Sequence, residues 1–162
     1  MKCDPIQSEK NSFLKAEREF TNHRDDLPTI YAITPTVKKL VQKADLTRLS
    51  YTLKWVPNLH WIIIEDAEEK SDMVERLLKK SKISYTHLNF RTPDEHQIHP
   101  GEKWYSKPRG VLQRNLGLKW IRENLNPHIN KGTVYFVDDD NTYDLELFEE
   151  VLNKDTFQYL LS

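Results

Sequence analysis

The chain is poor in the residues that build cross-linked, fibrous or membrane-spanning proteins. Its 162 residues include a single cysteine, Cys3, so no disulfide can form within the chain. Only four glycines occur, which excludes a collagen-like or glycine-rich repeat. No apolar run approaches the ~20 residues that a transmembrane helix needs, and the polar start, residues 1–26, lacks the apolar segment of a secretory signal. By itself this pattern favours a soluble cytosolic protein, or a chain from which an upstream anchor has been lost.

An excess of charge of either sign is also missing. Acidic and basic side chains nearly cancel, and the formal net charge is −1 at pH 7. Nucleic acids and anionic membranes attract strongly basic proteins, so we expect no nucleic-acid partner. The length fits one domain of ~100–200 residues with a single sizeable core.

Short apolar strands alternate with amphipathic helices through most of the chain. Apolar spacing predicts strands over residues 29–34, 61–64, 85–90 and 133–137, and helices over residues 38–55, 72–80, 110–124 and 145–152. Strands that are apolar on both faces are typical of a sheet covered on both sides. The order therefore predicts an α/β fold, with a Rossmann-like, mostly parallel sheet and helices on both faces.

The composition divides the chain into a domain and two tails. Residues 1–27 form a polar tail or stem remnant, and residues 154–162 form a C-terminal tail. Residues 28–153 between them form the α/β domain. A long irregular loop over residues 91–108 interrupts this domain, and loops of that length are often functional.

Polar clusters follow three of the predicted strands. They are Thr34-Pro35-Thr36, Glu65-Asp66 and Asp138-Asp139-Asp140. Ligands of open parallel sheets bind beyond the carboxyl ends of the strands. We therefore expect the three clusters to converge on one edge of the sheet.

The run of three aspartates is the strongest functional signal. Adjacent carboxylates repel one another, and a hard divalent cation such as Mg²⁺ or Mn²⁺ would neutralise them. One alternative is a solvated junction in which Asp140 or Asn141 caps the next helix. A calcium EF-hand loop is excluded, because Tyr143 stands where that loop needs glycine. A metal that bridges a diphosphate remains, with Asp140 as its ligand and Asp138 beside a ribose or a basic side chain.

Two arginines stand near the start of the predicted helix 110–124. Arg109 and Arg114 oppose the helix dipole, and a bound anion would resolve that conflict. Pairing of Arg114 with the aspartates is the alternative, and both can hold at once. Asp66 is interpreted either as a solvated loop acid or as an acceptor for a nucleobase N–H.

The remaining candidates favour structural roles. His87 alternates within a predicted strand and shows no metal-ligand spacing. Trp55, Trp61 and Trp120 fall on apolar stripes, which predicts that they are core residues. The sequence contains no glycine-rich phosphate loop and no nucleophile-elbow motif.

Five motifs occur in order between residues 29 and 152. They are Ile33-Thr34-Pro35-Thr36, Leu59-His60-Trp61 with Glu65-Asp66-Ala67, Tyr85-Thr86-His87-Leu88, Pro108-Arg109-Gly110-Val111 with Gln113-Arg114-Asn115, and Tyr135-Phe136 with Asp138-Asp139-Asp140-Asn141-Thr142-Tyr143. In this order they resemble the animal β-1,3-glucuronosyltransferases, glycosyltransferase family 43. The resemblance leans toward the branch that completes the galactose-galactose-xylose linker of proteoglycans.

The resemblance implies a GT-A-type nucleotide-sugar fold and an inverting transfer of glucuronic acid. The donor would be UDP-glucuronic acid, the metal Mn²⁺ and the acceptor a galactose-terminated glycan on protein. It also implies a Golgi type II membrane protein that acts on the lumenal side and pairs as a homodimer at full length.

The resemblance implies roles for individual residues as well. Asp140 would ligate Mn²⁺, while Asp138 and Asp139 would contact the ribose and the sugar of the donor. The other implied contacts are Asp66 and Arg109 with the uracil, Pro35 and Thr36 in the same pocket, and Arg114 with the donor sugar or the acidic run.

Two departures from the family pattern stand out. Val37 replaces the tyrosine that follows Pro-Thr in the family, which removes a stacking contact worth up to ~1.5 kcal/mol. The chain also ends soon after the metal motif, so the acceptor-binding half and its catalytic base are expected to be absent. We therefore expect a donor-binding half with little activity alone.

Two other functions are compatible with the same residues. One is a non-catalytic, UDP- and metal-binding or regulatory isoform that associates with a full-length enzyme. The other is a metal-dependent phosphohydrolase, which is disfavoured because no aspartyl nucleophile motif accompanies the acidic run.

Overall fold

The fold is a four-stranded parallel sheet between two layers of helices. The computed structural model describes residues 24, 26–98, 100–103, 109–126 and 131–153, so the predicted tails at residues 1–23 and 154–162 lie outside the described residues. The strands are β1 (Thr29–Val37), β2 (Leu59–Asp66), β3 (Ser84–Asn89) and β4 (Gly132–Phe136). They pair in the order β3-β2-β1-β4, and every pair is parallel. The predicted α/β sheet is confirmed.

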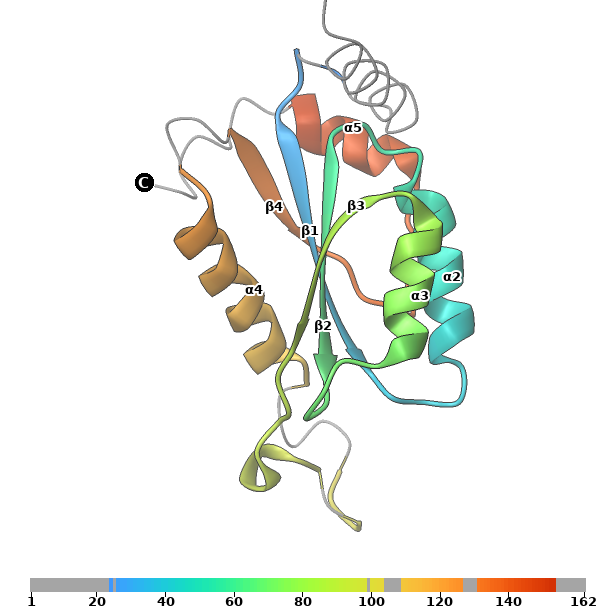
Figure 1. Cartoon of the computed structure of the whole chain (residues 1–162), viewed down its shortest axis with the longest axis vertical. Helices are drawn as coiled ribbons and strands as arrows, with labels where there is room; N and C mark the ends of the chain where they lie inside the picture. Colours follow the sequence, from blue (N-terminus) through green and yellow to red (C-terminus); the bar gives the residue numbers. More distant parts are fainter. Residues whose placement is uncertain (1–23, 25, 99, 104–108, 127–130, 154–162) are drawn as a thin grey trace, which may run out of the picture.

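Helices cover both faces of this sheet, as the apolar strands predict. The helices are α2 (Gln42–Leu53), α3 (Asp72–Ser81), α4 (Val111–Asn124) and α5 (Leu145–Asn153). α2, α3 and α5 share one hydrophobic cluster with the sheet, and α4 packs on the opposite face (Figure 1). Successive side chains of β1 point to opposite faces of the sheet, so both faces of this strand are buried. Ile30 and Ala32 join the first cluster, whereas Tyr31 and Ile33 join the second.

The chain adds strands on one side of β1 and then on the other, so the strand order reverses between β1 and β4. The chain proceeds from β1 to β2 and β3 through α2 and α3, then returns through α4 to place β4 on the other side of β1. Such a reversal is the switch point of an open parallel sheet, and ligands of these folds bind at the carboxyl ends of the two strands that flank it. Thr36 and the acidic run lie at these two ends.

β1 extends past Pro35 to Val37, so the predicted end of this strand at residue 34 is wrong. The carbonyl of Ile33 accepts a hydrogen bond from the amide of Val137 on the β4 side, at 2.9 Å. Alternate residues face the same neighbour, so Pro35 also faces that side, where the β4 ladder has ended at the Ile33–Phe136 pair. Its missing N–H therefore costs no ladder hydrogen bond.

α2 is shorter than predicted at both ends. It begins at Gln42 rather than at residue 38, and Leu40 and Val41 in the preceding turn are exposed. At its end the amides of Trp55 and Val56 bond three residues back, to Thr52 and Leu53, which tightens the last turn. Val56 then points into the core while Trp55 is exposed, so the prediction that Trp55 is a core residue is wrong.

The start of α3 is capped locally, and the core prediction is confirmed for Trp61. The Ser71 hydroxyl caps α3 by accepting the amide of Val74 at 3.3 Å. Trp61 is fully buried between the sheet and the helices. Trp120 is partly buried and stacks on His60 with 5.6 Å between ring centroids.

We predict that Gly132→Ala destabilises the protein by ~1–3 kcal/mol. A Cβ at this position would lie 2.4 Å from the backbone oxygen of Thr29 and 2.6 Å from the Tyr31 ring, so β4 would have to move away from β1. Urea unfolding measures the change. The neighbouring exposed substitution Lys131→Ala is the control and should stay within about 0.5 kcal/mol of the parent. Equal effects of the two substitutions would contradict this account of β4 packing.

Candidate functional site

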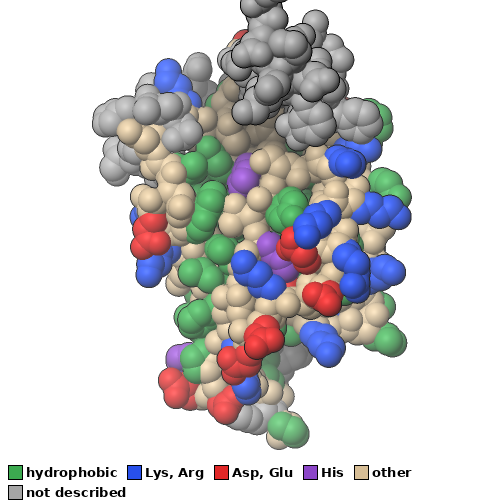
Figure 2. Space-filling model, in the orientation of Figure 1, with side chains coloured by type: hydrophobic (Ala, Val, Ile, Leu, Met, Phe, Trp, Pro, Cys, Tyr) green, Lys and Arg blue, Asp and Glu red, His purple; other side chains and the backbone are tan. Residues whose placement is uncertain are grey.

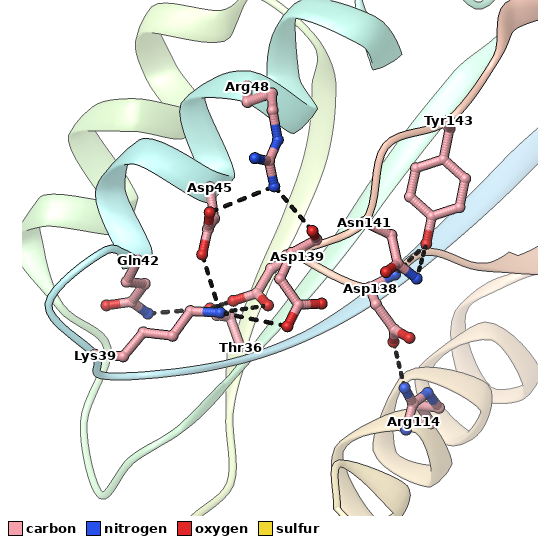
Figure 3. Close-up of polar contacts among 11 residues, drawn as sticks. Thr36, Lys39, Gln42, Asp45, Arg48, Arg114, Asp138, Asp139, Asn141 and Tyr143 are labelled. Carbon is pink, nitrogen blue, oxygen red and sulfur yellow. Dashed lines mark hydrogen bonds and ion pairs between the residues drawn. The ribbon is translucent and has the colours of Figure 1, made fainter.

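The three consecutive aspartates after β4 point in three different directions. Asp138 pairs with Arg114 of α4, whereas Asp139 turns toward Thr36 and Lys39 on the β1 side (Figure 3). Asp140 stays largely in solvent, with 66% of its side chain exposed. The run therefore spreads its charge instead of concentrating it in one place.

Asp139 is the buried member of the run, with 7% of the residue exposed. Its Oδ2 accepts a hydrogen bond from the Thr36 hydroxyl at 2.7 Å, and its Oδ1 lies 3.0 Å from the Lys39 ammonium. The Gln42 amide donates in turn to the Thr36 oxygen at 3.1 Å. Both carboxylate oxygens are thus occupied, and the loop after β4 is tied to the end of β1 and the start of α2.

Lys39 serves several carboxylates at once. Its Nζ lies 3.0 Å from Asp45 Oδ2 as well as 3.0 Å from Asp139, and 3.9 Å from Asp140 Oδ2. Partial burial favours its neutral form, but the hydrogen bonds to Asp139 and Asp45 outweigh this and raise the pKa of Lys39. The side chain is therefore a permanent positive charge within the acidic cluster.

Two further side chains fix the backbone of the acidic loop. Arg48 of α2 donates to the carbonyl oxygen of Asp140 at 2.9 Å and to Asp45 at 3.4 Å. The amide of Asp138 donates to the Tyr143 hydroxyl at 2.7 Å, and the Tyr143 ring packs on Phe148 of α5. Burial raises the pKa of Tyr143, so its hydroxyl stays protonated. The loop is braced from both sides.

Arg114 links the acidic loop to the start of α4. It pairs with Asp138 and donates to the carbonyl oxygen of Arg109 at 3.0 Å. The prediction that Arg114 pairs with the aspartates is confirmed. Arg109 is exposed just before the helix, and Gly110 takes a left-handed conformation whose missing Cβ lets Pro35 approach. This close contact brings the end of β1 against the start of α4.

Asp66 is held by the long loop after β3. Its two oxygens accept the amide and the hydroxyl of Thr92, both at 2.7 Å. The buried side chain of Gln113 in α4 donates to the Thr92 hydroxyl at 3.1 Å and to the carbonyl of Phe90 at 2.9 Å. Asp66 also lies opposite Val37 in the β1–β2 ladder. The carboxylate is thus fixed next to the end of β1.

Glu65, by contrast, does not belong to the edge cluster that the sequence predicts. Its side chain turns inward, where it accepts the amide of Ser71 at 2.8 Å and lies 2.7 Å from His87 Nε2. The other nitrogen of His87 lies 2.9 Å from Glu75. The prediction that His87 is structural is confirmed, and only Asp66 of this pair remains at the edge.

The predicted site residues therefore fall into three neighbouring positions. Thr36 contacts Asp139 and Arg114 contacts Asp138 at the carboxyl ends of β1 and β4. Pro35 joins them through Gly110, and Asp66 lies one strand away. Arg109 is exposed at the start of α4. Acidic and basic side chains are interspersed over the face of the molecule shown in Figure 2.

Sequence reasoning missed the residues that hold these groups in place. They are Lys39, Gln42, Asp45, Arg48, Thr92 and Gln113. One usable signal was the pair Asp45 and Arg48, which lie on the same face of α2 at a spacing of three. Asp45 is buried beside Leu46 and Leu49, and a buried acid on a helix needs a cation.

The donor set fits a divalent metal in one specific way. Among the described residues, no group of three or more His, Cys, Asp or Glu side chains is arranged to hold a metal ion. Magnesium-like ions usually take one or two carboxylates, several waters and substrate phosphates. Asp140 is exposed and can serve as such a single carboxylate, since Asp138 and Asp139 are already paired.

Fold and site together define an α/β domain with a cluster of charged and polar side chains at the switch point of a parallel sheet, where ligands of such folds bind. Comparison with known proteins makes the assignment specific. The model of glycosyltransferase family 43 matches residues 49–158, and the chain belongs to this family.

Individual relatives agree with this assignment. The human galactosylgalactosylxylosylprotein 3-beta-glucuronosyltransferase 1 is 48% identical over 128 residues, which cover 78% of this chain and 38% of the human protein. The sqv-8 glucuronosyltransferase of Caenorhabditis elegans is 52% identical over 124 residues, which cover 76% of this chain and 35% of that protein. The chain thus spans less than two-fifths of the length of either relative.

One solved structure to which the chain is similar is S. aureus TarS 1-349. The two align with a TM-score of 0.46 at 16% identity, and the alignment covers 75% of this chain and 30% of the TarS chain.

None of the helices in the described part of the chain is long and apolar enough to cross a bilayer.

The contacts of Glu75 with His87 and Lys79 predict how the stability of the protein changes at acidic pH. Hydrogen bonds from His87 and Lys79 lower the pKa of Glu75 from 4.5 to about 2. A carboxyl with a lowered pKa stabilises the fold above its unfolded pKa and loses that contribution as pH falls toward its folded pKa. We therefore expect the stability difference between the parent and Glu75→Gln to shrink between pH 4.5 and about 2.

Chemical unfolding at a series of pH values measures this difference. Glu69→Gln, an exposed glutamate on the turn before α3, is the control and should track the parent throughout. A gap between parent and Glu75→Gln that stays constant over this range would rule out the proposed coupling.

Proposed function

We propose that this chain is the donor-binding part of a β-1,3-glucuronosyltransferase, which binds UDP-glucuronic acid together with Mn²⁺. The supporting observation is that the three aspartates have different environments. Asp138 pairs with Arg114, Asp139 is buried and bonded to Thr36, and Asp140 remains exposed at the switch point. The relatives at about half identity are named as 3-beta-glucuronosyltransferases.

The residues at the switch point then take distinct roles toward the donor. The bound metal supplies positive charge that stabilises the diphosphate as a leaving group. Asp140 holds that metal, and Arg114 keeps Asp138 oriented toward the ribose. Asp139, whose two oxygens already contact Thr36 and Lys39, lies beside the donor sugar and fixes the loop that carries Asp140.

The uracil subsite lies one strand farther along the sheet edge. Asp66 accepts a base N–H there, with Pro35 on the same face of the sheet and Arg109 at the start of α4. Thr36 points to the opposite face, toward Asp139 and Gln42. Val37 stands opposite Asp66 with 39% of its surface exposed, so an aliphatic side chain lines this pocket where the family has an aromatic one. We expect weaker base stacking and weaker donor affinity as a result.

The acceptor in this proposal is a galactose-terminated linker glycan of proteoglycans, at the lumenal face of Golgi membranes. The names of the relatives specify a galactosylgalactosylxylosyl-protein as their acceptor. Transfer also needs a general base within hydrogen-bond reach of the acceptor hydroxyl. We assign the role of general base to no residue of this chain. The proposal also includes pairing of full-length copies as a homodimer.

Asp140→Asn tests the metal role directly. Removing the charge of the exposed carboxylate should reduce Mn²⁺-dependent UDP binding by about tenfold or more, since a charge-assisted contact is worth ~1.5–3 kcal/mol. Isothermal titration with UDP, with and without Mn²⁺, measures the change. Asp144→Asn, an exposed aspartate before α5, is the matched control and should bind like the parent.

Absence of any metal-dependent UDP binding by the parent would end the proposal. A transfer assay from UDP-glucuronic acid to a digalactosyl acceptor adds the second readout. Metal-dependent binding without transfer would identify a binding or regulatory chain rather than a complete enzyme.

Thr92→Val tests the uracil subsite. The substitution removes the hydroxyl that bonds Asp66 and leaves Gln113 without its acceptor there, so Asp66 is held by the Thr92 amide alone. We expect UDP affinity to fall about fivefold to tenfold, from the ~1 kcal/mol of a typical hydrogen bond. Thr92→Ser keeps the hydroxyl and should restore parent-like affinity. Equal binding by Val and Ser variants would remove Thr92 from the subsite.

A further inference from the structure

The ammonium of Lys39 lies among the carboxylates of Asp45, Asp139 and Asp140, where it supplies positive charge that a metal ion would otherwise supply. Lys39 follows the end of β1, and its ammonium lies within 3.0 Å of Asp45 and Asp139 and 3.9 Å from Asp140 (Figure 3). The side chain is about three-quarters buried, which limits screening by solvent. Two of its three acidic partners come from the loop after β4.

The position of Lys39 has two consequences for a divalent ion. Asp139 has both oxygens engaged, by Lys39 and by Thr36, so it is not free to act as a ligand. A metal at Asp140 would also lie close to the Lys39 ammonium, and like charges at such distances repel. The acidic run therefore offers a lone metal ion one carboxylate and a nearby positive charge.

A diphosphate changes this balance. It brings several negative oxygens, which can complete the coordination of the metal and lie beside the ammonium at the same time. The charge that opposes the metal alone would then stabilise the metal together with the diphosphate. Lys39 therefore weakens binding of the metal alone and strengthens binding of the metal together with a diphosphate.

We propose that Lys39 is a positioning residue that keeps divalent metal from Asp140 until a nucleoside diphosphate arrives, and so couples metal binding to nucleotide binding. The proposal rests on the proposed function of this site as a metal–nucleotide site. Coupling of this kind is reciprocal: UDP tightens Mn²⁺ binding by the same factor as Mn²⁺ tightens UDP binding. Lys39 sets the size of that factor.

Lys39→Gln tests the proposal with Mn²⁺ alone as the first probe. The electron paramagnetic resonance signal of free Mn²⁺ measures binding without any turnover. Removing the ammonium should tighten binding of Mn²⁺ alone about thirtyfold, the effect of a unit positive charge on a divalent ion roughly 4 Å away under water-like screening. The factor by which UDP enhances Mn²⁺ binding should fall below that of the parent.

Three further variants separate charge from structure. Lys39→Arg keeps the charge and should behave like the parent. Lys38→Gln removes a charge from the neighbouring exposed lysine and should also leave binding of Mn²⁺ unchanged. Thr36→Val frees one oxygen of Asp139 while Lys39 remains, and should not tighten binding of Mn²⁺ alone.

Several outcomes would overturn the role of Lys39. They are unchanged or weaker Mn²⁺ binding by a folded Lys39→Gln variant, and a gain in Thr36→Val or in Lys38→Gln. If Lys39→Gln does not fold, the parent still decides: tight binding of Mn²⁺ without UDP contradicts the proposal, and weak binding that UDP strengthens supports it. Failure of the parent to bind UDP with Mn²⁺ refutes the proposed function instead, while Mn²⁺ alone still reports on Lys39.

Discussion

The buried carboxylate of Asp139 is the contact on which the rest of the site depends. It joins the loop after β4 to Thr36 at the end of β1 and to Lys39 before α2. Breaking a buried pair by removing one partner typically costs ~3–5 kcal/mol, because the remaining charge stays out of water. The acidic loop is therefore part of the folded core at the switch point and not a free surface turn.

With Asp139 fixed, the two neighbouring aspartates are forced apart. Successive residues point in different directions, so Asp138 faces Arg114 on α4 while Asp140 faces solvent. Arg48 and Tyr143 then hold the backbone on either side. The arrangement provides one exposed carboxylate on a rigid support, which is the kind of preorganisation that metal–phosphate sites need.

Family membership and local geometry explain different aspects of this chain. The match to glycosyltransferase family 43 covers residues 49–158, which contain β2, β3, β4 and the acidic run. The geometry adds how the side chains are held: Thr92 and Gln113 form a directed hydrogen-bond chain onto Asp66, and Val37 stands opposite that carboxylate. These contacts fix the orientation of Asp66 at the end of β2.

The sequence by itself determined the alternation of strands and helices, because apolar periodicity and caps such as Ser71 are local signals. It also placed Thr36, Asp66 and the acidic run at one edge, since parallel strands must end together. Only the tertiary structure decided that Glu65 turns inward to His87 and that Lys39 is surrounded by carboxylates. Such pairings join segments up to about a hundred residues apart, and the position of a charge among its partners is not encoded in local spacing.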